Sequence, residues 1–490
     1  MAEAASVPFS ETKAPESADR LHRGALSLVD ISASTMANIG PAYSFYFGFA
    51  GIVIAAGLAA PLVVLVAAVA IALLGNTLSQ FSRAQPSTGG FISFVGKTFG
   101  GTSAVTTALL CGAGYIIAIS SVLAIVGGFL SIILNYYLGW NVPWGIFSLI
   151  LTAGAIFMMV RGVAVSTKLA GLFFGFEMLV LVVVSVAALI QHGSHLSAIP
   201  FEPSHITKGF SGLAAGFPLA VYLFIGWENS AALAEETSQP RRNVPRAVFL
   251  SIVLMSVGYL LFAYATVTGF GYNSAKLTSP TTLIPFIPVA HGIWAGLAAF
   301  AYIAGMTSTL GVLISATNSQ CRLIFNAGRE GLLPSWIGKV HPTRRTPVNA
   351  IFFFITVASA IILVWGLLHL IGHNQSGNMS AVTFFAESAT MGTILVLIVY
   401  FLSNLALPFY YRKYRPQEFH VVKHLILPVL GMVAIAVPVY YLVKPGQLAP
   451  YDWFPYAALA VLVMAVIYAF ILTRFRPGLG DRVGSIVADE

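Results

Sequence analysis

The chain has 490 residues, of which 58% are hydrophobic and only 9% carry a full charge. Soluble domains have about 25% charged residues, so this composition excludes an ordinary soluble protein and favours one embedded in a lipid bilayer. The net charge of +8 comes from basic residues spread over many loops, which excludes a nucleic-acid-binding domain with one basic face.

Apolar stretches long enough to cross a bilayer core, about 20 helical residues each, recur along the chain. The first 24 residues contain no such stretch and are interpreted as a cytosolic tail rather than a secretory signal. The sequence therefore predicts an all-α integral membrane protein with twelve transmembrane helices. These spans are expected at residues 25–54, 57–80, 104–134, 143–160, 166–190, 210–235, 246–269, 287–322, 348–370, 381–408, 424–443 and 453–473.

The positions of the basic residues support this count. With the N-terminus in the cytosol, only Lys208, Lys276 and Lys444 of the 25 lysines and arginines fall in outer segments. The positive-inside rule predicts such an asymmetry, and a wrong number of spans would remove it. We therefore expect both termini to be cytosolic and the inner loops to face anionic membrane lipids.

Two of the spans carry helix-breaking residues near their middles. The first contains Gly40-Pro41, where the proline lacks an amide donor and clashes with the carbonyl four residues before it. The sixth contains Gly216-Phe217-Pro218 and then Ile225-Gly226-Trp227-Glu228. Irregular backbone at membrane depth is tolerated only where it is buried in protein or lines a wet cavity. Since spans one and six begin two blocks of five, the pattern favours a midplane binding site, and ordinary proline kinks are the alternative.

Three motifs in order along the chain resemble those of the amino acid–polyamine–organocation (APC) transporters. They are Pro86-Ser87-Thr88-Gly89-Gly90-Phe91, Ile225-Gly226-Trp227-Glu228 with Pro240-Arg241-Arg242-Asn243-Val244-Pro245-Arg246-Ala247, and Arg329-Glu330-Gly331-Leu332-Leu333-Pro334 with Thr346-Pro347. The resemblance covers residues 24–410. It implies a LeuT-type fold with spans one and six discontinuous, and secondary transport of amino acids or related amines.

The same resemblance implies a division of the chain. Residues 25–190 and 210–408 would form two inverted repeats of five helices, and residues 424–473 two peripheral helices. Residues 1–24 and 474–490 would be cytosolic tails.

The resemblance also implies which groups bind the substrate. Amides at the start of the outer half of span one would bind a carboxylate, and carbonyls at the two breaks would bind an ammonium group. The implied residues are Ile39, Gly40, Pro41, Ala42, Tyr222, Phe224, Ile225, Gly226 and Trp227. Tyr222 would close over the substrate, with packing inside the bundle as the alternative. Many relatives have Gly-x-Gly where this chain has Gly40-Pro41-Ala42. Because Pro41 has no amide, one donor to a substrate carboxylate is missing, and the substrate could therefore also be an amine or a modified amino acid.

An acidic residue lies deep in span five. Glu177 follows Lys168 by nine residues, which places it about 13 Å into the span at 1.5 Å per residue. Because a charge at this depth is costly, an ionisable residue there is interpreted as functional. We expect Glu177 to carry a coupling proton, with Ser308 and Thr309 of span eight as hydroxyl partners by a looser alignment with the family. A structural, hydrogen-bonded carboxyl is the alternative.

Five further acidic residues are expected near span ends or breaks. Glu228 would either bind the amides freed by the break in span six or act in gating. Glu387 would line an outer vestibule or contact water at the interface. Asp30 is expected to form a helix cap or to reach the inner interface. Glu235 and Glu236 are expected to join an ion-pair network on the inner side.

The leading hypothesis is a proton-coupled permease, a symporter of the plasma membrane that works by alternating access. An amine or amino-acid exchanger and a sodium-coupled symporter are the alternatives within transport. Outside transport, a membrane-embedded ligand sensor or an anchoring subunit fits the composition, whereas a channel would need a more polar stripe. No motif indicates an enzyme, a cofactor, a metal site or a nucleic-acid partner. The expected partners are a small-molecule substrate, a proton and membrane lipids, and the sequence indicates neither the exact substrate nor an oligomeric state.

Overall fold

The computed structural model describes residues 24, 26–161, 163–279, 282–344, 346–372, 380–445, 450–476 and 478–479. Helices make up nearly all of this part of the chain, and its one recorded β-contact is an isolated bridge between Leu26 and Thr237. The all-α fold is confirmed. The predicted tail at residues 1–23 and most of that at 474–490 lie outside the described residues.

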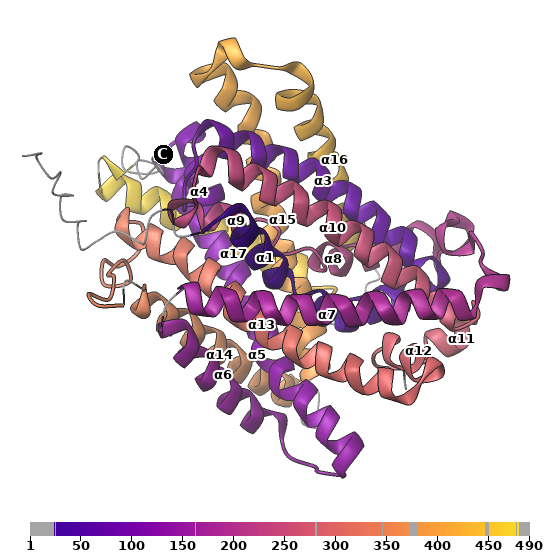
Figure 1. The fold of residues 1–490 in the computed structure, drawn as a ribbon. Coiled ribbons are helices and arrows are strands. Elements are labelled where there is room, and N and C mark those ends of the chain that lie inside the picture. The colour runs from indigo at the N-terminus through magenta and orange to yellow at the C-terminus, as the bar shows by residue number, and fades with distance from the viewer. Residues whose placement is uncertain are drawn as a thin grey trace, which may run out of the picture.

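The helices follow one another with short connections, as drawn in Figure 1. In chain order they are α1 (Leu28–Ile39), α2 (Pro41–Ala56), α3 (Ala60–Ala84), α4 (Gly90–Phe99), α5 (Gly101–Leu138), α6 (Trp144–Val160), α7 (Val163–Gln191), α8 (Gly209–Tyr222), α9 (Asn229–Ala232), α10 (Pro240–Gly269), α11 (Ser274–Leu277), α12 (Phe286–Ile293), α13 (Ala295–Arg329), α14 (Val348–Gly372), α15 (Ala381–Tyr414), the π-helix η7 (Val422–Ile426), α16 (Leu427–Val443) and α17 (Phe454–Phe475).

Within the described ranges, eight helical segments are long and apolar enough to cross a membrane. The longest, Leu28–Ala84, contains α1, α2 and α3, and three shorter apolar helices are Trp144–Val160, Gly209–Tyr222 and Val422–Val437. The protein is therefore a multi-pass membrane protein. The count of twelve spans and the boundaries of the two five-helix repeats stay predictions.

The first predicted span is two helices. α1 begins with a capping box, in which the Ser27 hydroxyl accepts from the Asp30 amide and the Asp30 carboxylate accepts from the Ser27 amide at 2.9 Å. This confirms Asp30 as a capping residue. α1 ends because Gly40 takes a left-handed conformation with φ of 60°. α2 starts at Pro41, a first-turn position where a missing amide costs nothing.

The sixth predicted span is also interrupted. α8 ends at Tyr222, residues 223–228 form tight turns, and the one-turn helix α9 follows. Gly226 in this segment has φ of 109°, a conformation that strains any residue with a side chain. Pro218 lies inside α8 without ending it, since transmembrane helices re-satisfy the backbone groups that a proline frees. The break therefore lies at Gly226 and not at the earlier proline.

The predicted eighth span differs from the structure at both ends. Its expected start belongs to a separate helix, α12, which is divided from α13 by the extended backbone of Trp294. Its expected end, Arg322, lies inside α13, which continues to Arg329. The helix thus continues seven residues beyond the predicted end of the span, and the charge of the buried Arg322 is compensated by an acidic partner described below.

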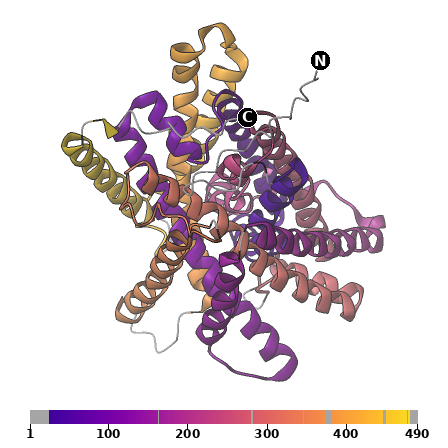
Figure 2. The same cartoon turned by 60° about the vertical axis from the view of Figure 1, so that its left-hand side comes forward.

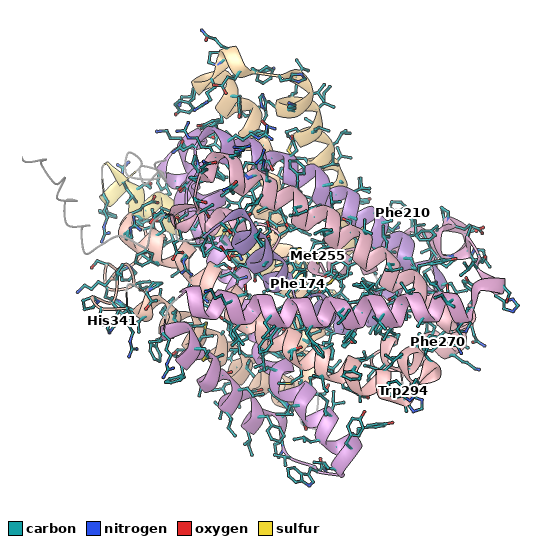
Figure 3. All side chains as sticks on the ribbon, viewed as in Figure 1. Phe174, Phe210, Met255, Phe270, Trp294 and His341 are labelled. Atoms are coloured by element: carbon teal, nitrogen blue, oxygen red, sulfur yellow. The ribbon has the colours of Figure 1, made fainter. Side chains whose placement is uncertain are left out.

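The arrangement of the helices brings the two interruptions together. α1 packs against α7, α10 and α13, while α2 packs against α8. α5 runs through the centre of the bundle, and the turn from α15 to α16 stands at the edge of the molecule in both views (Figures 1 and 2). Figure 3 shows His341, from a predicted inner loop, at one end of the long helices. At the other end it shows Phe270, from a predicted outer loop, with Phe210 and Trp294, from the predicted outer parts of spans six and eight.

Candidate functional site

The two interrupted segments meet in the middle of the bundle. The side-chain amide of Asn38, in the last turn of α1, donates to the carbonyl of Gly226 at 3.5 Å. A Cβ added at Gly226 would lie 3.0 Å from the carbonyl carbon of Asn38, closer than side chains pack. The absence of a side chain at Gly226 thus allows the turn of span six to approach the end of α1.

The first amides of α2 are bound by side chains of two other helices. Pro41 has no amide, the Ala42 amide donates to Glu177 Oε2 at 2.9 Å, and the Tyr43 amide donates to Ser308 Oγ at 2.9 Å. Ser308 also hydrogen-bonds the Glu177 carboxyl, which is only 1% exposed. A carboxyl at the positive end of a helix is a favourable arrangement. The Ala42 amide, expected to meet a substrate carboxylate, is bound in this structure by the protein's own carboxyl.

The two hydroxyl residues expected near Glu177 differ in their contacts. Ser308 lies against the Glu177 carboxyl, as expected from the resemblance. The hydroxyl of Thr309 instead donates to the carbonyl of Gly305 within α13 at 2.7 Å. The structure therefore brings together Glu177 and Ser308, and it leaves Thr309 in a local helical hydrogen bond.

Aromatic residues close the space on the side of α2 and α8. The hydroxyls of Tyr43 and Tyr222 are 2.8 Å apart, and Ser121 of α5 hydrogen-bonds both. The ring of Phe385 from α15 lies edge-on to both tyrosines, with ring centres 5.6 and 5.4 Å away. We call Tyr43, Ser121, Tyr222 and Phe385 the aromatic closure.

A small cavity lies beneath this closure. Its lining includes Asn38, Ile39, Tyr222, Ile225 and Gln320. Its volume is about 20 Å³, enough for about one water molecule and far too little for an amino acid. The central cavity in this structure is therefore too small to hold a substrate.

The predicted substrate-binding residues divide into two groups. Ile39, Tyr222 and Ile225 line the central cavity. The side chains of Phe224 and Trp227 pack elsewhere: Phe224 lies against Tyr259, and the Trp227 indole donates to the hydroxyl of Tyr400 at 3.1 Å. If these two residues contact a substrate, they do so through their backbone.

Glu228 supports the turn of span six. Its carboxyl accepts from the Tyr115 hydroxyl at 2.7 Å and from the Gly226 amide at 3.1 Å. The Gly226 amide is one of those that the break frees, so Glu228 makes the contact expected of the structural alternative. Glu387 is also buried and accepts from the Trp365 indole at 2.7 Å, and its role stays a prediction.

A buried ion pair lies where α13 meets residues 234–238. Arg322 of α13 donates to Glu236 at 2.7 Å, and both side chains are 2% exposed. Backbone hydrogen bonds join Leu26 to this segment, with its amide donating to the Glu236 carbonyl at 2.9 Å. Glu235 pairs with Arg329 at 3.3 Å. The ion pairs expected of Glu235 and Glu236 are confirmed, whereas their location on the inner side of the membrane stays a prediction. We call the Arg322–Glu236 pair the inner latch.

Sequence reasoning missed several residues of the site. They are Asn38, Tyr43, Tyr115, Ser121 and Gln320, which line the cavity or bind the residues beside the breaks. Asn38 could have been found from the sequence, because it is an amide side chain inside an apolar span, two residues before the break at Gly40. Polar groups in a bilayer are costly unless they have partners, so such residues mark positions where two helices or a ligand meet.

An all-helical membrane fold whose first and sixth predicted spans break at facing positions is the architecture of LeuT-type secondary transporters. A family comparison agrees with this class. The model of the amino acid permease family matches residues 26–473, and the chain belongs to this family.

Individual relatives are distant. The chain is 25% identical to the branched-chain amino acid permease BcaP of Bacillus subtilis, over 60% of this chain and 65% of that protein. It is 28% identical to cationic amino acid transporter 4 of Mus musculus, over 68% of this chain and 54% of that protein. It is 26% identical to the mouse Asc-type amino acid transporter 1, over 65% of this chain and 60% of that protein. The matches thus span between about half and two thirds of the length of these curated relatives.

The solved structure of MHP1, a nucleobase-cation-symport-1 family transporter in a closed conformation with bromovinylhydantoin bound, has a similar fold. Its TM-score is 0.52 at 13% identity, covering 95% of this chain and 99% of MHP1. At this identity the likeness shows the fold alone.

Proposed function

We propose that this protein is a secondary active transporter that moves an amino acid or related amine across the plasma membrane, with both termini in the cytosol. The observation that carries the proposal is the meeting of two interrupted helices, at Gly40 and at residues 223–228, beside a closed central cavity. Exposed backbone groups at such breaks bind small solutes in transporters of this architecture. Membership of the amino acid permease family supports an amino acid or amine as the solute.

The two closures of the cavity suit alternating access. The aromatic closure seals the side of α2 and α8, and the inner latch lies on the opposite side, where α13 meets residues 234–238. A carrier must open one seal while the other stays shut. Because the two seals share no side chain, each can break without the other.

Proton coupling through Glu177 follows from its contacts. As a carboxylate, Glu177 accepts from the Ala42 amide and hydrogen-bonds Ser308, which ties α2 to α7 and α13. Protonation turns one carboxyl oxygen into a donor, and hydrogen bonds to a neutral carboxyl are weaker than those to a charged one. A bound proton therefore loosens α2 and shifts the balance between the two states of the broken helix.

Uptake by purified protein in liposomes tests this function. Labelled leucine and lysine are offered under an inward proton gradient, an inward sodium gradient, or no gradient with unlabelled amino acid inside. The proposal expects accumulation of at least one compound under the proton gradient alone. Accumulation that requires sodium or internal amino acid would replace proton coupling by one of the alternatives. No uptake under any condition would refute the transporter.

A further inference from the structure

A second cavity lies beyond the turn of span six, on the side of α4 and α9. Its volume is about 20 Å³, and it shares Asn38 and Gln320 with the central cavity. Its polar lining consists of Asn38, Tyr115, Glu228, Asn229, Ser319 and Gln320. The two cavities are therefore neighbours, separated by two side chains that contribute to both.

Three amide oxygens at this second cavity have no hydrogen-bond partner. They belong to Asn38, Asn229 and Gln320, whose exposed fractions are 4%, 2% and 6%. The NH₂ group of Asn38 faces the carbonyl of Gly226, which can only accept, so the oxygen of Asn38 faces away from that carbonyl. The NH₂ group of Asn229 is likewise used, donating to Ser34 Oγ at 3.2 Å. Buried carbonyl oxygens are normally paired, and three around one cavity indicate a missing donor.

The cavity also contains an acidic side chain, Glu228, and its carboxyl, like the three amide oxygens, attracts a positively charged group. The Glu228 carboxyl is bound by the Tyr115 hydroxyl and the Gly226 amide. Among the described residues no lysine, arginine or histidine pairs with Glu228. The hydroxyl of Ser319 donates to the carbonyl of Ala316, so it offers no free donor to the cavity. An acidic group and three free acceptors match a cation that brings several N–H donors.

We propose that this cavity binds an ammonium group of the substrate, and that the transported compound carries a second amine at its far end, as basic amino acids and diamines do. The inference rests on the proposed function and names its substrate class. An ammonium group has three donors and no acceptor, which equals the number of free amide oxygens. Asn38 and Gln320 line both cavities, so a substrate held at the two breaks would extend between these two side chains.

Lysine and norleucine, which differ only in the terminal amine, test the proposal. Competition against labelled lysine uptake gives an apparent affinity for each compound. We expect wild-type protein to prefer lysine by about tenfold or more, the scale of hydrogen bonds to a charged group. Gln320→Met and Glu228→Gln should bring the ratio towards one, while Gln191→Met, at the exposed end of α7, should keep the wild-type ratio. A wild-type preference for norleucine, or an unchanged ratio in both cavity variants, would overturn the inference.

A binding measurement separates this inference from the transport hypothesis. Thermal unfolding of the purified protein is followed with lysine, norleucine, sodium chloride or choline chloride. The proposal expects a larger stabilisation by lysine than by norleucine, and its loss in Glu228→Gln. Stabilisation by sodium without an effect of lysine would assign the cavity to a metal ion and refute the ammonium site. If no compound is transported, the proposed function fails, and the comparison of lysine with norleucine still decides the site.

Discussion

Replacing Arg322 by methionine is expected to open the protein on the side of the inner latch. The substitution leaves Glu236 buried without its cationic partner, while both side chains are 2% exposed in the closed structure. Breaking a buried ion pair in this way costs about 3–5 kcal/mol. A state in which Glu236 reaches water avoids that cost, so the population of the open state should rise by roughly 100-fold or more.

The native thiols provide the assay. Cys111 and Cys321 are the chain's two cysteines, and both are buried. In a Cys111→Ala background the reaction of N-ethylmaleimide with Cys321, the neighbour of Arg322, reports opening of the inner side. Local relaxation around Glu236 reduces part of the cost of about 3–5 kcal/mol for the unpaired charge. We therefore expect the labelling rate to rise at least about tenfold in Arg322→Met.

A second ion pair serves as the control. Arg329 pairs with Glu235 at 3.3 Å, and their side chains are 17% and 10% exposed, so Arg329→Met should cost about 1 kcal/mol or less and change labelling by fivefold at most. Adding Glu236→Gln to Arg322→Met removes the unpaired charge and should bring the rate back towards wild type. A folded Arg322→Met protein that labels no faster than wild type would show that the latch does not hold the inner side shut.

Three further predictions concern the centre of the site. Glu177→Gln should flatten the dependence of uptake on external pH, because the side chain no longer titrates, and an unchanged pH profile would exclude it as the proton carrier. Gly226→Leu should abolish substrate binding measured by thermal shift, since even a Cβ would lie 3.0 Å from Asn38; Gly154→Leu, at an open position on α6, is the control and should bind normally. Tyr222→Phe removes two hydroxyl contacts of about 0.5–1.5 kcal/mol each, together about 1–3 kcal/mol, and should raise the KM for uptake about fivefold or more, whereas a KM within twofold of wild type would argue for a packing role alone.

Features fixed by neighbouring residues could be predicted from the sequence. Gly40-Pro41 ends one helix and starts the next through the conformations of these two residues alone, so the position of the first break was foreseeable. The same holds for Gly226, although Pro218 gave a second, misleading signal. Hydropathy alone placed Glu177 inside an apolar span, and the structure buries it there.

Contacts between distant spans could not be predicted in this way. The bond from Ala42 to Glu177 joins residues 135 positions apart, and no local pattern shows which side chain will meet a freed amide. The predicted eighth span ended at Arg322, because an isolated arginine is costly in a membrane. Its burial depends on Glu236, 86 residues away, and only the packing of α13 against residues 234–238 reveals that pair.

The bond between Glu177 and the start of α2 bears on how the carrier returns after unloading. A cargo-free carrier that leaves a positive helix end bare in the membrane interior pays an electrostatic penalty during reorientation. Here α7 supplies a carboxyl oxygen that accepts from the Ala42 amide at 2.9 Å, so in the proposed cycle the unloaded protein keeps a partner for that helix end. Under the proposed function this feature suits net accumulation, in contrast to an antiporter, which must bind a new substrate before each return step.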